Sequence, residues 1–488
     1  MTEETKSTII GKTVVSRPWE AWRDDRLERF RLAAYLNTVI SSISHPFVIN
    51  LSAPYGTGKT FFLRNWQRQL LDEGGRVAYL NANQAEISGD PFVALSCTLR
   101  DQVFSDPGER YLKDYDALMD RASPFITRKD KPIVSNAHDQ AKSQILHYGD
   151  IMGSMNSFRS ELVQLVASMG TNQPDPRRRK IILLIDELDR CRPSYLLEML
   201  ECLRNLFLVP GIITVLAADQ VHMRNVISGI YGGEAGGEGY LRKFIDWELT
   251  LPDPSYKVFA KHLYSVFRVE EAGVFIPGRD PFRGDEHLIE GFAFFADLCK
   301  LTLRQQHHCF MQINIVARAL KAEGRPFGFL LGALTALRMA YGSEISRFCN
   351  GQRPINELIH DFEEDGMEKI GNHLRIGWHD FKARFHAWFL TPDEENILKS
   401  ELKELQNEIK SMIESRVMNS RELPLKNRIA YLDSVLKTYH AVRKDSAFTG
   451  DESPAQSVFR DLEKGMFLID SLNVSINGDF SSRVQKGI

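Results

Sequence analysis

One short segment, residues 53–60, constrains the fold of this chain more than any other feature. It reads Ala-Pro-Tyr-Gly-Thr-Gly-Lys-Thr and fits the pattern G-x-x-x-x-G-K-[ST], except that Ala53 replaces the first glycine. The apolar run before it, residues 47–52, predicts a buried strand, and residues 60–71 predict a helix. A strand, a glycine-bearing loop and a helix in this order predict a loop that binds phosphate groups.

The residue types in this loop suit a nucleoside triphosphate. Gly56 and Gly58 can adopt backbone angles that turn N–H groups toward phosphate oxygens. Lys59 is expected to reach the β- and γ-phosphates of ATP, and the Thr60 hydroxyl to bind Mg²⁺. A chance glycine-rich turn is the alternative, which the flanking strand and helix disfavour. The predicted nucleotide contacts are Ala53, Pro54, Tyr55, Gly56, Thr57, Gly58, Lys59, Thr60, Phe61 and, further along the chain, Asp219.

A second, acidic motif begins where another apolar run ends. Residues 180–186 predict a strand that is buried on both faces of a parallel sheet. An acid at the carboxyl end of such a strand lies beside the phosphate loop, so Asp186 is expected to hold Mg²⁺. Glu187 is then placed to deprotonate an attacking water, which makes it the predicted general base beside the catalytic Lys59. The alternative is that Glu187 only caps the next helix, which Asp189 could do equally well.

Three neighbouring residues have open roles. Asp189 and Arg190 could form a local ion pair, or Arg190 could reach the γ-phosphate bound by a neighbouring subunit. Asp219 follows the apolar run 212–218, so it could contact the attacking water or the γ-phosphate as a sensor residue. Asp219 could equally cap the next helix, and the sequence favours neither role.

Strands and helices alternate in the first half of the chain, and helices alone follow. Further strands are predicted at 76–81 and 212–217, and helices at 25–43 and 196–207. The alternation predicts an α/β fold, a P-loop NTPase core whose parallel sheet is flanked by helices. Beyond Pro252 the strand signal fades, which predicts an all-α lid and a C-terminal helical domain. The expected domains are an N-terminal extension (1–22), the core (23–255), the lid (256–345) and a C-terminal domain for partner or oligomer contacts (346–488).

Composition and charge exclude several classes of protein. Hydrophobic residues make up 43% and charged residues 26%, as in globular domains rather than disordered chains. With 61 basic and 64 acidic residues the net charge is −3, so nucleic acid is a possible partner that the overall charge does not indicate. Six scattered cysteines without a C-x-x-C pair indicate reduced thiols. The N-terminus lacks a signal-peptide pattern, and no apolar stretch reaches the roughly 18 residues that span a bilayer, so we expect a soluble cytoplasmic protein.

Longer motifs resemble one protein family. Residues 185–220, which begin Ile-Asp-Glu-Leu-Asp-Arg-Cys-Arg-Pro, and residues 230–252, which contain Tyr-Leu-Arg-Lys-Phe, look like the KAP P-loop NTPases. The resemblance covers residues 23–255 and, more loosely, 256–345. It implies an ASCE-type core, with an extra strand between the two motif-bearing strands and a helical domain behind it. Many members have transmembrane helices between the two motifs, whereas residues 84–178 of this chain are polar.

This chain departs from the family pattern at three positions. Members usually have Gly-x-Trp-Gly in the loop, where this chain has Ala53 and Tyr55. The Asn-Ala-Trp that often follows the second strand is Asn-Ala-Asn here, ending at Asn83. These departures concern the fit around the nucleotide rather than membership of the family.

The resemblance also implies an activity. It implies a Mg²⁺-dependent ATPase that acts as a nucleotide-driven conformational or assembly switch. Because bacterial members often occur in mobile elements and phage-defence loci, it suggests the regulatory ATPase of an anti-phage system, acting as a homo-oligomer with separate effector proteins. By analogy with sensor arginines, Arg304 would act on the γ-phosphate, with Arg242 and Lys243 as further candidates. A solvated surface cation is the alternative for each.

Two other functions stay open at this point. One is an assembly scaffold that binds ATP with little turnover, which the intact Lys59, Thr60, Asp186 and Glu187 disfavour. The other is a DNA-handling ATPase, which would need a concentrated basic face in the C-terminal region, whereas residues 393–416 mix acids and bases. The basic run 177–180 directly precedes a buried strand, so a solvated loop is favoured there over a nucleic-acid patch.

The C-terminal region contains one distinct helical pattern. Thr391-Pro392-Asp393-Glu394 has the residues of a helix start, with an acid at the capping-box position. Apolar residues then follow from Leu398 to Met412 at coiled-coil spacing for only about two heptads. An ordinary helical hairpin within its own domain is therefore favoured over a coiled coil.

Overall fold

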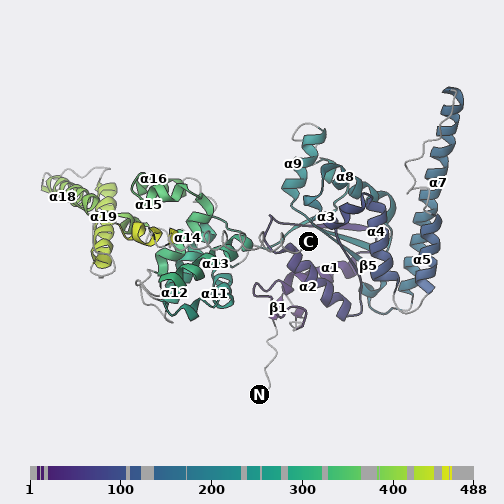
Figure 1. The fold of residues 1–488 in the computed structure, drawn as a ribbon, viewed down its shortest axis with the longest axis horizontal. Helices are drawn as coiled ribbons and strands as arrows, with labels where there is room; N and C mark the ends of the chain where they lie inside the picture. Colours follow the sequence, from purple (N-terminus) through teal and green to yellow (C-terminus); the bar gives the residue numbers. More distant parts are fainter. Residues whose placement is uncertain are drawn as a thin grey trace, which may run out of the picture. The chain divides into compact units, whose positions relative to one another are not determined.

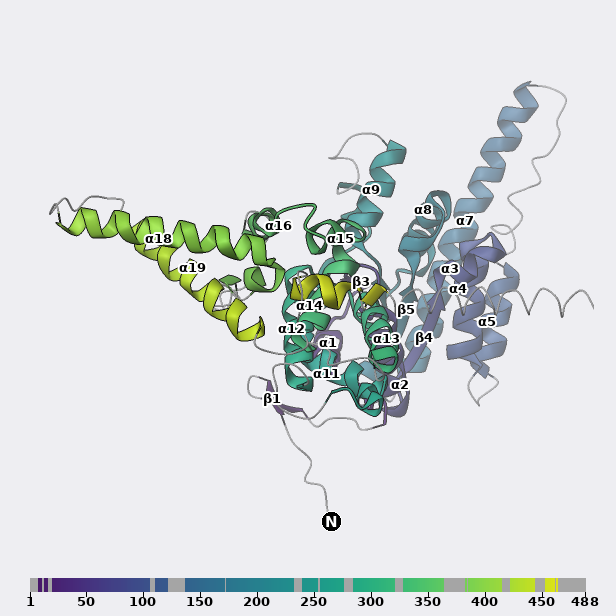
Figure 2. The same cartoon turned by 60° about the vertical axis from the view of Figure 1, so that its left-hand side comes forward.

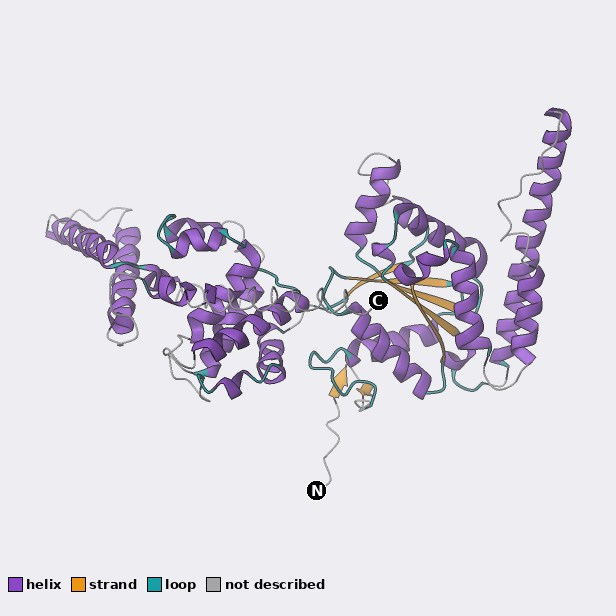
Figure 3. Ribbon diagram, viewed as in Figure 1, coloured by secondary structure: helices purple, strands orange, loops and turns teal. Residues whose placement is uncertain are grey.

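The chain, in a computed structural model, divides into two compact units, residues 1–253 and 254–488 (Figure 1). The first unit contains a five-stranded sheet, and the regular elements in the described part of the second are helices (Figure 3). The structure describes residues 8–10, 13–15, 20–105, 110–121, 137–171, 173–231, 239–252, 255–275, 284–320, 328–363, 382–383, 385–414, 422–443, 453–460 and 462–463.

The sheet of the first unit is parallel throughout, with the strand order β4–β5–β6–β3–β7. Its strands are β3 (Phe47–Ser52), β4 (Arg76–Asn81), β5 (Ile181–Asp186), β6 (Ile212–Ala217) and β7 (Trp247–Thr250). The predicted bounds of β3, β4 and β6 are confirmed at both ends. β6 lies between β3, which leads into the glycine loop, and β5, which ends at Asp186. This is the extra strand that the family resemblance implies.

Two helices, α1 (Phe30–Ser42) and α2 (Lys59–Asp72), pack on one face of the sheet (Figure 3). Their buried apolar side chains contact alternate strand residues, as the period of two in a strand requires. Trp22 is fully buried in the same core, and its indole N–H donates to Gln69 Oε1 at 2.8 Å. Trp22 therefore belongs to the same apolar core as α1 and α2. The predicted N-terminal extension is described only in part: β1 (Thr8–Ile10) pairs antiparallel with β2 (Thr13–Val15), and the rest up to residue 19 lies outside the described residues.

The other face of the sheet is covered by more helices, which share a second apolar core. Helices α5 and α7 lie side by side in this layer (Figures 1 and 2). The elements of this layer and of its connections are α3 (Ala82–Ala85), η1 (Glu86–Ser88), α4 (Pro91–Leu99), η2 (Arg100–Phe104), α5 (Arg110–Arg121), α7 (Ala137–Gly170), η3 (Pro176–Arg179), η4 (Leu188–Arg190), α8 (Pro193–Cys202), η5 (Leu203–Phe207) and α9 (Gln220–Tyr231).

Two predicted helix bounds in the first unit are wrong. The helix expected at 25–43 begins only at Phe30, because the buried Asp25 carboxylate accepts the N–H groups of Leu27 and Phe30 and holds the preceding residues in a turn. The helix expected at 196–207 begins at Pro193 and changes to a π-helical turn at Leu203. Proline at a first helical position is favourable because its missing N–H has no partner there in any case.

Arg177 and Lys180, in the basic run at residues 177–180, form ion pairs and hydrogen bonds within the first unit. The Arg177 guanidinium contacts Glu73 Oε2 at 2.6 Å and Asp175 Oδ2 at 2.9 Å. Lys180 Nζ donates to the carbonyl oxygens of Ile40 and Ser41 near the end of α1. These contacts agree with the structural interpretation of the run rather than with a nucleic-acid patch.

The second unit is built around one large apolar core. Its helical elements are α11 (Tyr256–Val266), η6 (Val269–Ala272), α12 (Asp285–Leu298), α13 (Leu303–Leu320), α14 (Gly328–Tyr341), α15 (Glu344–Cys349), α16 (Ile355–Asp361), α18 (Pro392–Glu414) and α19 (Glu422–Arg443). The core includes residues from α12 as well as Phe385 and Phe459, so it continues across the predicted boundary at residue 345. Gly332 of α14 lies against α12 so closely that a Cβ there would be 2.4 Å from Leu288 O.

Helices α18 and α19 form a hairpin beside this core (Figure 2). Leu398 of α18 packs with Leu432, Val435 and Leu436 of α19, so the apolar residues at coiled-coil spacing face a helix of the same unit. The predicted capping box is also present. The Glu394 carboxylate accepts from the backbone N–H of Thr391 at 2.9 Å, and Thr391 Oγ1 accepts from the Glu394 N–H at 3.4 Å. Within the described residues, no helix is both long and apolar enough to cross a bilayer.

Candidate functional site

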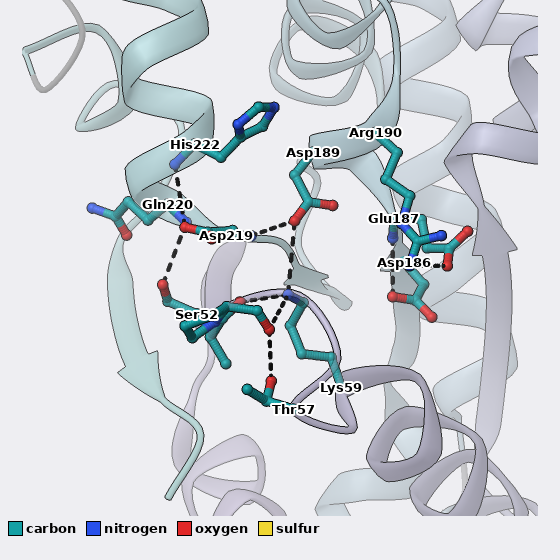
Figure 4. A network of polar contacts seen from close by, with 12 residues as sticks. Ser52, Thr57, Lys59, Asp186, Glu187, Asp189, Arg190, Asp219, Gln220 and His222 are labelled. Carbon is teal, nitrogen blue, oxygen red and sulfur yellow. Dashed lines mark hydrogen bonds and ion pairs between the residues drawn. The ribbon is translucent and has the colours of Figure 1, made fainter. Parts of the chain in front are cut away.

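The carboxyl edge of the parallel sheet gathers the polar residues that both sequence motifs supply. The glycine loop follows β3, Asp186 ends β5, Asp219 follows β6, and Asn81 ends β4. In the strand register Asn81 lies opposite Asp186. Figure 4 shows Lys59 of the loop, Asp189 after β5 and Asp219 before α9 close together at this edge, with Asp186 and Glu187 to one side of them. Ligands of open α/β sheets bind at such an edge.

The loop has the backbone of an anion site. Gly56 and Gly58 have φ angles of 82° and 94°, in the left-handed region that glycine adopts without a steric penalty. Helix α2 follows directly, and Gly58, at its N-cap position, has no side chain that could accept a hydrogen bond from the first turn. The first N–H groups of a helix carry positive partial charge, so this end of α2 fits a phosphate group. The Thr57 hydroxyl donates to Pro54 O at 2.7 Å and closes the loop on itself.

Lys59 is held in the loop by oxygen atoms on three residues. It is buried, at 9% exposure, and its ammonium group donates to Ala53 O at 2.5 Å and to Pro54 O at 3.4 Å. A third oxygen, Asp189 Oδ2, lies 3.7 Å from Nζ. Ala53, the departure from the glycine pattern, thus contributes its carbonyl to the position of the lysine. The remaining predicted nucleotide contacts, Tyr55, Thr60 and Phe61, are exposed at the loop and the first turn of α2.

Asp186 is buried, at 1% exposure, and both of its carboxylate oxygens have donors. The Tyr79 hydroxyl donates to Oδ2 at 2.8 Å, and the backbone N–H of Glu187 donates to Oδ1 at 2.9 Å. Burial, and then the neighbouring Asp186 carboxylate, raise the pKa of Tyr79 well above its usual range, so the phenol stays a donor. A carboxylate at the end of β5 and the Thr60 hydroxyl at the start of α2 are hard oxygen ligands of the kind that Mg²⁺ prefers.

Glu187 is held in an unusual backbone conformation with two partners on its side chain. Its φ of 59° and ψ of 27° lie in the left-handed region, which is rare for residues other than glycine and is often found at functional sites. Oε2 accepts from Asn81 Nδ2 at 3.0 Å, and Oε1 pairs with the Arg190 guanidinium at 2.9 Å. The carboxylate does not cap the turn that follows it, η4. The observed contacts thus differ from the capping alternative.

Arg190 pairs with Glu187 rather than with Asp189. Its guanidinium also lies 4.2 Å from the ring centre of Tyr55, a cation–π contact with the glycine loop. Asp189 instead faces Lys59 and accepts the backbone N–H of Asp219 at 2.7 Å. The local Asp189–Arg190 pair that the sequence allowed is therefore not the arrangement in the described residues.

Asp219 caps helix α9. Its Oδ1 accepts the N–H groups of Val221 at 3.0 Å and His222 at 3.2 Å. The next residue, Gln220, is linked to β3, because its N–H lies 3.4 Å from Ser52 Oγ and its side-chain oxygen accepts from Asn50 Nδ2 at 3.3 Å. The capping role is observed, and a contact between Asp219 and nucleotide stays a prediction.

The candidate sensor cations lie at three further positions. Arg242 and Lys243 are exposed in a turn before β7, where Lys243 lies 5.3 Å from the Tyr240 ring. Arg304 is the second residue of α13, in the second unit. The action of these cations on the γ-phosphate stays a prediction.

Sequence reasoning assigned no role in catalysis to Asn81 and Tyr79, the two β4 residues that contact the acidic motif. Both contacts depend on β4 lying next to β5. One signal could have identified Asn81: it ends a predicted strand, and polar residues that end parallel strands meet at the same edge.

Comparisons with known proteins identify one family model and several similar solved structures. A family model described as the KAP family P-loop domain matches residues 30–275, half of the 488 residues. Similar solved structures include the Aeropyrum pernix ORC2 protein in ADPNP–ADP complexes, with 15% identity, 66% of this chain and 70% of that chain covered, and a TM-score of 0.30. Others are C. elegans PCH-2 (12% identity, 65% and 69% covered, TM-score 0.28) and AMPPCP-bound DnaA from Aquifex aeolicus (15%, 75% and 96%, 0.25). A search of curated proteins found no match.

Proposed function

Because the chain belongs to the KAP family of P-loop NTPases, we propose that it is a Mg²⁺-dependent ATPase that works as a nucleotide-driven conformational or assembly switch. One observation carries the proposal. The buried Lys59, at the start of α2, and the acids Asp186 and Glu187, at the end of β5, all lie at the carboxyl edge of one sheet. A cation that can bind phosphate beside a carboxylate pair is the arrangement that phosphoryl transfer to water needs.

In the proposed reaction, the chain's own groups bind the phosphates and move one proton. The N–H groups of the loop and of the first turn of α2, together with Lys59, would bind the β- and γ-phosphates. Thr60 and Asp186 would hold Mg²⁺, which would supply neutralising charge to the phosphate oxygens. Glu187 would accept the proton of the attacking water as the new oxygen–phosphorus bond forms and the bond to the ADP oxygen breaks.

A second candidate is a scaffold that binds ATP with little turnover. The observation that favours it is the double engagement of Glu187, whose two oxygens contact Asn81 and Arg190. These two contacts restrain the position of the carboxylate. The two candidates therefore differ in whether these partners release Glu187.

The deciding experiment measures phosphate release with Mg·ATP while the mass in solution is recorded with and without nucleotide. We expect turnover in the wild-type protein and an ATP-dependent rise in mass, with turnover lost in Lys59→Ala and Glu187→Gln. Glu198→Gln makes the same chemical change at an exposed site on α8 and should leave turnover unchanged. ATP binding without turnover, the same in wild type and Glu187→Gln, would favour the scaffold.

We further propose that this switch is the regulatory ATPase of an anti-phage defence system and acts with separately encoded effector proteins. The support is the family resemblance. The test compares phage plating on cells that carry the complete locus with either wild-type protein or Lys59→Ala. Equal plating on both would contradict the defence role without affecting the ATPase proposal.

A further inference from the structure

A single carboxylate oxygen joins the loop lysine to the start of helix α9. Asp189 Oδ2 lies 3.7 Å from Lys59 Nζ and accepts the backbone N–H of Asp219 at 2.7 Å (Figure 4). The side chains of Lys59 and Asp189 are each only 10% exposed. Little water screens this pair, so the attraction is stronger than that of a surface ion pair.

The N-terminus of α9 depends on the same contacts. Asp219 provides the cap of α9 through the N–H groups of Val221 and His222, while its own N–H is bound by Asp189. A change in the position of the Asp189 carboxylate would therefore alter the contact that holds Asp219, the capping residue of α9. Helix α9 carries Val221 and Ile230, large apolar side chains that are 60% and 47% exposed.

We propose that Asp189 is a positioning residue. Its carboxylate competes with nucleotide phosphate for Lys59, and a change in the position of this carboxylate changes the N-terminal cap of helix α9. An ammonium group has three donors, and here they are surrounded by Ala53 O, Pro54 O and Asp189. Phosphate oxygens at the loop would draw Lys59 away from Asp189, the one negatively charged partner of the three. This inference rests on the proposed function, since it takes Lys59 to be the phosphate-binding cation.

The coupling must act in both directions. If phosphate binding weakens the Lys59–Asp189 contact, then a stronger contact weakens phosphate binding by the same factor. Removing the negative charge of Asp189 should therefore tighten nucleotide binding. A residue that only supports the local fold predicts the opposite sign, because disturbing it would loosen the loop.

The test uses Asp189→Asn, which removes the charge and keeps an oxygen that can accept the Asp219 N–H. Calorimetry on the full chain would measure the binding of ADP and of a non-hydrolysable ATP analogue. We expect binding of the analogue to become about tenfold tighter, as for loss of one competing partly buried charge. Asp175→Asn is the matched control: it makes the same substitution at another carboxylate that accepts a backbone N–H, that of Arg177, but Asp175 precedes β5 and lies at the opposite edge of the sheet.

A second measurement follows the effect on α9. Hydrogen exchange at the amides of Val221 and His222 should change when the analogue binds to the wild-type protein, and the change should shrink in Asp189→Asn. Unchanged or weaker binding in Asp189→Asn, or exchange at these amides that does not respond to nucleotide, would overturn the coupling while leaving the ATPase proposal intact. A wild-type protein that binds neither nucleotide would overturn both.

Discussion

Asn81 offers a direct test of whether the predicted base is restrained. Its Nδ2 donates to Glu187 Oε2 at 3.0 Å, and its Oδ1 accepts the N–H of Gln84 at 3.0 Å and caps α3. The substitution Asn81→Ser removes the amide donor and keeps a side-chain oxygen that can cap the helix. It therefore separates the contact with Glu187 from the local helix cap, which Asn81→Ala would not do.

The expected effect follows from the strength of this contact. A hydrogen bond to a charged group contributes about 1.5–3 kcal/mol net when it is well buried. The Glu187 side chain is 17% exposed and keeps Arg190 as a partner, so we take about 1 kcal/mol, which is below the range for charged groups and typical of hydrogen bonds in general. If Glu187 must leave Asn81 before it accepts a proton, losing the contact lowers the barrier by that amount and raises turnover about fivefold.

The assay is the initial rate of phosphate release over a range of Mg·ATP concentrations up to saturation. We expect kcat to rise in Asn81→Ser while KM for ATP changes little, because Asn81 contacts the base and not the loop. Asn83→Ser, an exposed position in the same short helix, is the matched control and should leave kcat unchanged. A lower kcat in Asn81→Ser, with unfolding free energy preserved, would refute the restraint and show that Asn81 orients Glu187 productively.

Three further predictions concern the stability of the chain. Gly332→Ala would place a Cβ 2.4 Å from Leu288 O, so α12 and α14 must separate. We expect the free energy of unfolding in denaturant to fall by about 2–3 kcal/mol, and an unchanged midpoint would contradict the close approach of the two helices. Burial lowers the pKa of His386 to about 4, below its value of about 6.5 in an unfolded chain. The unfolded state therefore binds the proton first, stability falls as pH drops from about 6.5 to about 4, and His386→Gln should flatten that dependence of Tm. Tyr79→Phe leaves the buried Asp186 with one donor fewer and should cost about 1–2 kcal/mol of unfolding free energy, whereas equal stability would mean that water replaces the phenol.

The sequence predicts the bounds of the strands that consist of short apolar runs. β3, β4 and β6 are short apolar runs between turn residues, and their bounds match the structure to the residue. The sequence pattern does not predict the edge strand β7, because it has only four residues and lacks the continuous apolar run of the central strands; in the described part of the chain it pairs with β3. The start of α1 was missed for another reason. The predicted helix includes Asp25, whereas the Asp25 carboxylate accepts the N–H groups of Leu27 and Phe30 in the turn that leads into α1.

For the candidate site, the sequence predicts the residues but not the contacts between them. Lys59, Thr60, Asp186 and Glu187 can be proposed from the sequence because each belongs to a short, contiguous motif. The contacts between these residues cannot. Lys59 meets Asp189, and Glu187 meets Asn81, only because the strand order brings β3, β6, β5 and β4 together at one edge.

The contacts between the motif residues, rather than the motifs themselves, would control the proposed ATPase. A motif specifies that a base is present, but the readiness of that base depends on its neighbours. Glu187 has one partner, Arg190, that also contacts Tyr55 of the glycine loop, and another, Asn81, that also caps α3. Movement of either the loop or α3 would therefore change the partners of the same carboxylate. A chain with all motif residues intact can then turn over slowly or rapidly, according to whether these two contacts hold, and the Asn81→Ser rate distinguishes the two cases.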